Sequence, residues 1–162
     1  MAHVFGFSAW SGTGKTTLLE KVIRELKARR LRVSVIKHDV HGIDPCEDGK
    51  DSGRFRLAGA DRVTLIGPED GREPEKSLWD TLDLQTDADI ILVEGFRHAP
   101  IPRIGLCRMT AGKPLPEPPE NYIAVVADVE IGTSVPLFRW DEHRELTDFL
   151  LGQTKDFTAV RI

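Results

Sequence analysis

Residues 8–17, SAWSGTGKTT, place a loop of small residues and a Lys-Thr pair between a short apolar run and an amphipathic helix. The apolar run before the loop is typical of a buried strand, and the apolar residues after it recur at helical spacing. The pattern Ala9-x-x-x-x-Gly14-Lys15-Thr16 matches a P-loop in which Ala replaces the usual first Gly. Strand, loop and helix in this order predict a phosphate-binding loop.

Each residue type in the loop has a physical reason to be there. Main-chain N–H groups would point at the phosphates, and the positive end of the following helix faces the same anion. Lys15 would reach the β- and γ-oxygens, and the Thr16 hydroxyl would bind Mg²⁺. The residues predicted to bind nucleotide here are Ser11, Gly12, Thr13, Gly14, Lys15, Thr16 and Thr17.

A second signal is the run IILVEG at residues 90–95, in which four apolar residues end in a carboxylate and a glycine. In P-loop nucleoside triphosphatases, an acidic residue at the carboxyl end of a buried strand lies beside the Mg²⁺. We therefore predict that Glu94 binds the metal together with Thr16, or orients the attacking water. Lys15 and Glu94 are the predicted catalytic residues.

The segment 37–60 is rich in charge and glycine and begins where a predicted strand ends, which is where α/β proteins place ligands. His38 and His41 could contribute to a metal site, but histidines on a loop are more often solvated or hydrogen-bonded. Lys50, Arg54 and Arg56 could clamp an anion or form surface ion pairs. The sequence leaves these alternatives open.

Composition narrows the class of protein. The 162 residues, 40% hydrophobic and 30% charged, are typical of a single globular domain spanning 1–162. A net charge of −4 argues against nucleic acid as the main partner. Cys46 and Cys107 are too few for a disulfide framework or a thiolate zinc site. No run is long enough for a membrane span, so we expect a cytoplasmic protein without a membrane partner.

Strand and helix patterns alternate along the chain, which predicts an α/β fold: a three-layer, P-loop NTPase-like fold with a mostly parallel central sheet flanked by helices. Strands are predicted at 4–8, 33–37, 63–66, 90–94, 104–108 and 123–127, and helices at 15–29, 52–59, 75–84 and 141–151. Asp141 is the predicted cap of the last helix. The proline-rich residues near 109–120 are predicted to form a protruding loop.

The chain resembles the molybdopterin-guanine dinucleotide biosynthesis protein B (MobB) family. The resemblance rests on the Gly-Lys-Thr-Thr-Leu loop, on VIKH at 35–38, on GKDS at 49–52 with Arg54 and the Ala-Gly-Ala at 58–60, and on ILVEGF at 91–96. These segments cover most of residues 4–108 in order. The last third of the chain matches only loosely, and Asp48 stands where family members often have Pro.

The resemblance implies a homodimeric P-loop protein that binds GTP and Mg²⁺ and assists the attachment of GMP to molybdopterin. The transfer itself belongs to a partner nucleotidyltransferase, MobA, so the protein would be an adapter with weak GTP hydrolysis, and it could also bind molybdopterin. The chain lacks an Asn-Lys-x-Asp guanine signature. Its position in the family suggests that Asp128 accepts from the guanine N1 and N2 hydrogens, although a turn or capping aspartate is an alternative.

A different enzyme class is compatible with the same loop. Small-molecule kinases also use a P-loop, together with an arginine-rich lid and an acid that takes the proton of the acceptor. Arg54, Arg56 and Asp51 could fill those roles. Transfer of phosphate to an acceptor alcohol rather than to water would favour the kinase.

Overall fold

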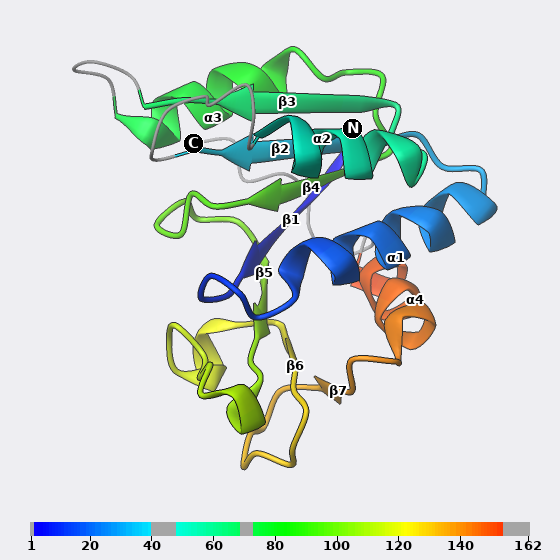
Figure 1. The fold of residues 1–162 in the computed structure, drawn as a ribbon. Coiled ribbons are helices and arrows are strands. Elements are labelled where there is room, and N and C mark those ends of the chain that lie inside the picture. Colours follow the sequence, from blue (N-terminus) through cyan, green and yellow to red (C-terminus); the bar gives the residue numbers. More distant parts are fainter. Residues whose placement is uncertain (1, 40–47, 69–72, 154–162) are drawn as a thin grey trace.

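The structure is a computed structural model that describes residues 2–39, 48–68 and 73–153. Its centre is a seven-stranded sheet in the order β3-β2-β4-β1-β5-β6-β7, in which every strand pair is parallel (Figure 1). The strands are β1 His3–Ser8, β2 Val33–His38, β3 Arg62–Ile66, β4 Ile90–Glu94, β5 Arg103–Leu106, β6 Ala124–Val126 and β7 Leu137–Phe138. The helices are α1 Lys15–Ala28, α2 Asp48–Leu57, α3 Pro74–Asp83 and α4 His143–Gln153, with 3-10 turns at Met109–Ala111 and Pro119–Asn121.

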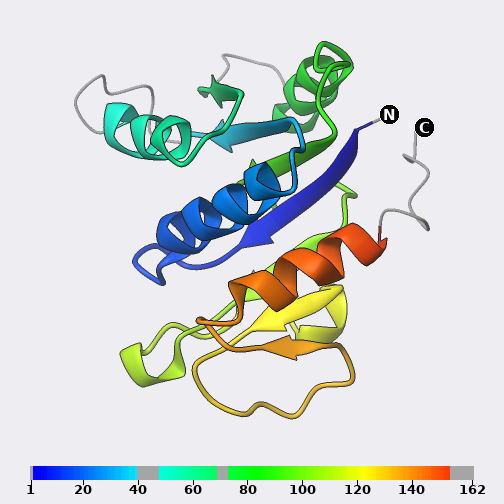
Figure 2. The same ribbon diagram turned by 90° about the vertical axis from the view of Figure 1, so that its right-hand side faces the viewer.

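Helices cover both faces of the sheet, which makes three layers (Figures 1 and 2). On one face, α1, α2 and α4 pack on a core that includes Phe5, Phe7 and Leu92. On the other face, α3 packs on a smaller core that includes Ile36, Ile91 and Val93. Successive side chains of a strand point to opposite faces, so a strand buried on both faces is apolar throughout. That is the pattern of β4, which is buried throughout and apolar up to its last residue, Glu94.

The α/β, P-loop NTPase-like fold predicted from the sequence is confirmed, with the predicted strands and helices in the predicted order. Two details were wrong. The two-residue strand β7 was not predicted, because two apolar residues give no periodicity. The last helix begins at His143, so Glu142, not Asp141, occupies the capping position, and the Glu142 carboxylate accepts from the Arg139 N–H at 2.8 Å.

Parallel pairing brings the predicted site to one edge of the sheet. β1 lies next to β4, with Phe7 opposite Glu94, and β4 lies next to β2, with Lys37 opposite Glu94. The carboxyl ends of these three central strands therefore meet beside the loop that leads into α1. None of the helices in the described residues is long and apolar enough to cross a membrane.

Candidate nucleotide-binding site

The loop between β1 and α1 presents open amides at the start of the helix. Gly14 caps α1 in a left-handed conformation, with φ of 107°, and the first helical bond runs from the Leu18 N–H to the Gly14 carbonyl at 3.1 Å. Within the described part of the chain, the N–H groups of Gly14, Lys15, Thr16 and Thr17 have no hydrogen-bond acceptor. Four such donors at a helix N-terminus form a ready site for an anion.

The rest of the loop is held from within. The Thr13 hydroxyl, which is buried, donates to the Trp10 carbonyl at 2.6 Å, and the Thr13 N–H reaches the same oxygen at 3.3 Å. Ser11 and Gly12 are exposed at the tip. The loop therefore has a fixed turn at Thr13 and an open outer side, as a phosphate-binding loop requires.

Lys15 and Glu94 meet at the centre of the site. The Lys15 Nζ lies 3.4 Å from the Glu94 Oε1, although the two residues are far apart in the sequence. Glu94 is 7% exposed, and its Oε2 is buried with no hydrogen-bond partner in the described residues. A buried carboxylate oxygen without a partner is unfavourable unless a cation or a donor joins it. A metal ion bound to this oxygen would stabilise the buried carboxylate.

The residues after Glu94 explain the Glu-Gly pair noted in the sequence. Gly95 has φ of 92°, and a Cβ on it would lie 2.7 Å from the Cβ of His38, so no other residue fits without movement. Phe96 also has a positive φ, 50°, and its ring stacks on the His38 imidazole with a centroid distance of 4.4 Å. Burial lowers the pKa of His38. His38 thus packs on the turn that follows β4.

The charged segment after β2 does reach the P-loop helix. The Arg54 guanidinium forms an ion pair with Glu20 and donates to the Thr17 hydroxyl at 3.2 Å. The Lys37 Nζ lies 2.8 Å from the Asp51 carboxylate. Arg54 is a candidate for an anion clamp, and Asp51 is the candidate for the acid of a kinase. In this structure both form ion pairs.

Other candidate residues of this segment are His41 and Lys50. His41 lies outside the described residues, and Lys50 lies in α2. Among the residues that the structure describes, no group of three or more His, Cys, Asp or Glu side chains could hold a metal ion. A metal at this site would accordingly depend on phosphate oxygens as well as on Glu94 and Thr16.

Sequence reasoning missed a second set of residues that contact the phosphate loop. The Arg108 Nε donates to the Thr13 carbonyl at 3.0 Å, and its guanidinium lies 4.1 Å from the centroid of the Trp140 ring. The Trp140 Nε1 in turn donates to the Cys107 carbonyl at 3.0 Å. A Cβ on Gly14 would come within 3.2 Å of Arg108 and 3.4 Å of Trp140. The only signal in the sequence was the position of Arg108 at the end of the strand predicted at 104–108.

Asp128 lies beyond the end of β6 and holds the turn that follows Arg108. Its carboxylate accepts from the Met109 N–H at 2.7 Å, from the Thr110 N–H at 3.0 Å and from the Thr110 hydroxyl. The hydrogen bond from Thr110 is the main reason why the pKa of Asp128 is lowered to about 2. The carboxylate is therefore ionised at neutral pH, and three donors of the chain already use it.

The chain matches the family model described as molybdopterin guanine dinucleotide synthesis protein B, MobB, over residues 4–128. It belongs to the MobB family. A molybdopterin-guanine dinucleotide biosynthesis adapter protein of Haemophilus influenzae is 39% identical over 165 residues, which cover 98% of this chain and 93% of that protein. The adapter protein of Escherichia coli is 38% identical, with 93% of each chain covered. The family resemblance found in the sequence is thus confirmed.

Solved structures show that the fold is shared. A MobB protein homolog from Bacillus stearothermophilus superposes with a TM-score of 0.60 at 21% identity, over 95% of this chain and 99% of that one. HypB from Helicobacter pylori, solved in complex with nickel, gives a TM-score of 0.66 at 15% identity, over 99% and 91% of the two chains. The MobB family fold therefore extends across nearly the whole of this chain.

Proposed function

We propose that the protein binds GTP and Mg²⁺ at residues 11–17 and serves as an adapter in the synthesis of molybdopterin guanine dinucleotide. The observation that carries the proposal is the meeting of Lys15 and Glu94, 3.4 Å apart, together with four open amides of a Gly-Lys-Thr-Thr loop. Relatives that are 38% and 39% identical carry the name of adapter in this biosynthesis. The family and the site geometry support the same function.

The residues present fit a nucleotide and its metal. Lys15 would leave Glu94 for the phosphate oxygens, which neutralises negative charge at the place where it is greatest. The freed Glu94 carboxylate, with its orphan oxygen, and the Thr16 hydroxyl would then hold Mg²⁺. When bound, Mg²⁺ would neutralise charge on the phosphates. We expect hydrolysis to be weak, in keeping with an adapter.

The proposal extends to the partners that the family implies. The protein would assist a MobA-type nucleotidyltransferase in converting molybdopterin to molybdopterin guanine dinucleotide. It would work as a homodimer in the cytoplasm. Asp128 is our proposed acceptor for the guanine hydrogens, because one lone pair of its Oδ1 is left after the bond to Met109. These assignments specify which base and which partner the phosphate loop would serve.

Calorimetry with GTP and ATP, each with and without Mg²⁺, tests the nucleotide site. We expect GTP with Mg²⁺ to bind, and Lys15→Ala to weaken it about 100-fold, because the mutation removes the charge-assisted contact to the phosphates. Arg24→Ala is the matched control, since Arg24 is an exposed cation farther along the same helix. No heat with either nucleotide, or equal binding by Lys15→Ala, would refute the proposal.

A further inference from the structure

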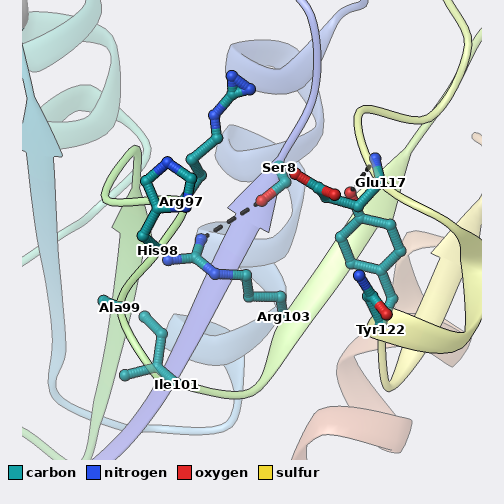
Figure 3. A pocket seen from close by; sticks show the side chains of 9 residues that line it. Ser8, Arg97, His98, Ala99, Ile101, Arg103, Glu117 and Tyr122 are labelled. Atoms are coloured by element: carbon teal, nitrogen blue, oxygen red, sulfur yellow. Dashed lines mark hydrogen bonds between the residues drawn. The ribbon is translucent and has the colours of Figure 1, made fainter.

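A cavity of about 300 Å³ lies on the face of the sheet opposite α1, and neither the P-loop nor the proposed nucleotide site uses it. Its lining residues come from the end of β1, from the turn after β4, from the start of β5 and from residues 117–122 (Figure 3). They are Ser8, Arg97, His98, Ala99, Ile101, Arg103, Glu117, Asn121 and Tyr122. The volume is at the lower end of the range for small-molecule sites, roughly 300–1,000 Å³.

The decisive feature of this cavity is a buried arginine without an acidic partner. Arg103 is 7% exposed, yet within the described residues no carboxylate forms an ion pair with it. Its guanidinium donates to the Ser8 hydroxyl at 3.3 Å, to the Gly95 carbonyl at 3.2 Å and to the Phe96 carbonyl. Its Nε is buried and has no hydrogen-bond partner in the part of the chain that the structure describes. A full positive charge is thus held among neutral oxygens, which is costly unless an anion joins it.

The strand beneath this arginine is shaped to hold it. A Cβ on Gly6 would come 2.8 Å from the Arg103 Nη1, so a side chain there would shift the guanidinium from its place across β1. Gly6 and Ser8 point away from Phe5 and Phe7, which pack under α1. Burial lowers the pKa of Arg103, but an arginine side chain keeps its proton in proteins at neutral pH. The charge is therefore permanent and fixed in place.

Other groups around the cavity add donors and a second cation. The Ser8 hydroxyl accepts from Arg103, which leaves its own hydrogen free to be donated. Arg97 lines the cavity, and its guanidinium lies 5.6 Å from the centroid of the Trp10 ring on the phosphate loop. Two arginines and one carboxylate, Glu117, line the cavity, so its lining carries a net positive charge. His98 and Asn121 can supply further hydrogen bonds.

We propose that this cavity binds the phosphate group of a small phosphomonoester, with Arg103, Arg97 and the Ser8 hydroxyl as its donors. An arginine can bind either a carboxylate or a phosphate through parallel N–H groups. A phosphate carries two negative charges and a carboxylate one, so a site with two cations and a hydroxyl suits a phosphate better. The volume left beyond the phosphate would take the organic part of the molecule. The proposal does not depend on nucleotide binding at the P-loop.

The test uses phenyl phosphate as the probe and the full chain carrying Lys15→Ala, which removes the cation of the P-loop. We expect calorimetry to show that this variant still binds phenyl phosphate, more tightly than it binds benzoate or phenol. Adding Arg97→Ala or Arg103→Lys should weaken binding about tenfold, because each removes part of the phosphate contact. Adding Arg24→Ala, the exposed control on α1, should leave binding unchanged.

Several results would overturn the proposal. Loss of all phenyl phosphate binding with Lys15→Ala alone would mean that the P-loop is the binding site for phosphate. Equal affinity for benzoate would remove the case for a dianion, and unchanged affinity with Arg97→Ala and Ser8→Ala would exclude the cavity even where Arg103→Lys does not fold. A parallel GTP titration keeps the two proposals apart, since Lys15→Ala should weaken GTP binding about 100-fold while phenyl phosphate binding persists.

Discussion

At the scale of single residues, Asp128 has two roles, one structural and one proposed for guanine binding, that one experiment can separate. Its carboxylate holds the turn at Met109 and Thr110, and it is our proposed acceptor for guanine. Asp128→Asn would place an amide among N–H donors and lose the charge, so both roles would weaken. We expect affinity for GTP to fall more than affinity for ATP, about tenfold for GTP.

The ratio of the two affinities is the measurement that matters for Asp128. Thr110→Ala is the matched control, because it removes the hydroxyl that donates to Asp128 but leaves the carboxylate charged. This control should affect both nucleotides alike. If Asp128→Asn lowered the affinities for GTP and ATP equally, the residue would be only a structural part of the turn.

Gly105 shows how a single missing side chain permits local packing. A Cβ at this position in β5 would lie 2.5 Å from the Cδ2 of the buried Tyr122 ring. Gly105→Ala should therefore lower the free energy of unfolding by about 1–3 kcal/mol, as overpacking of a core does. Urea unfolding followed by circular dichroism checks this prediction.

Gly53 provides the opposite expectation for the same substitution. It lies in α2, and a Cβ there would have nothing within 4 Å. Gly53→Ala should be neutral or stabilise by up to about 1 kcal/mol, because alanine favours the helix. Equal effects of the two mutations would show that Tyr122 moves aside at little cost.

At the scale of elements, the chain after β5 supports the phosphate loop from the side. Arg108 bonds the Thr13 carbonyl and stacks on Trp140, whose indole N–H bonds the Cys107 carbonyl. Arg108→Ala should free the loop and weaken GTP binding about tenfold, with a smaller change in the free energy of unfolding. Arg144→Ala, an exposed cation on α4, is the control, and an effect of Arg108→Ala on unfolding alone would contradict the prediction.

The same elements show what the sequence could and could not predict. Lys15 and Glu94 could be placed together, because parallel strands bring their carboxyl ends to one edge, and an acid at such an end was predicted to lie beside the metal of the P-loop. The positions of Arg108 and Trp140 beside the loop could not be predicted, since no sequence pattern links their segments to the loop. Arg103 resembles any charged residue at the start of a strand, and only the register with Gly6 reveals that it lies buried across β1.

At the scale of the whole molecule, Glu94 sets stability against ligand binding. It lies at the centre of the sheet edge, and one of its oxygens has no partner among the described residues, so the ligand-free fold bears the cost of a buried carboxylate. Glu94→Gln removes the charge at nearly constant volume, and Lys15, which is partly exposed, can turn to solvent. We therefore expect the ligand-free variant to be as stable as the natural protein or more stable, by about 1 kcal/mol.

The nucleotide should reverse that order. A ligand at 100 times its dissociation constant stabilises a protein by about 2.7 kcal/mol, and the variant should lose the part of this gain that depends on Mg²⁺. Thermal unfolding with GTP alone and with GTP and Mg²⁺ would measure both effects, with Glu130→Gln, an exposed carboxylate, as the control. A variant that unfolds at a lower temperature without ligand, yet keeps the full Mg²⁺-dependent shift, would show that Glu94 serves the fold and does not hold the metal.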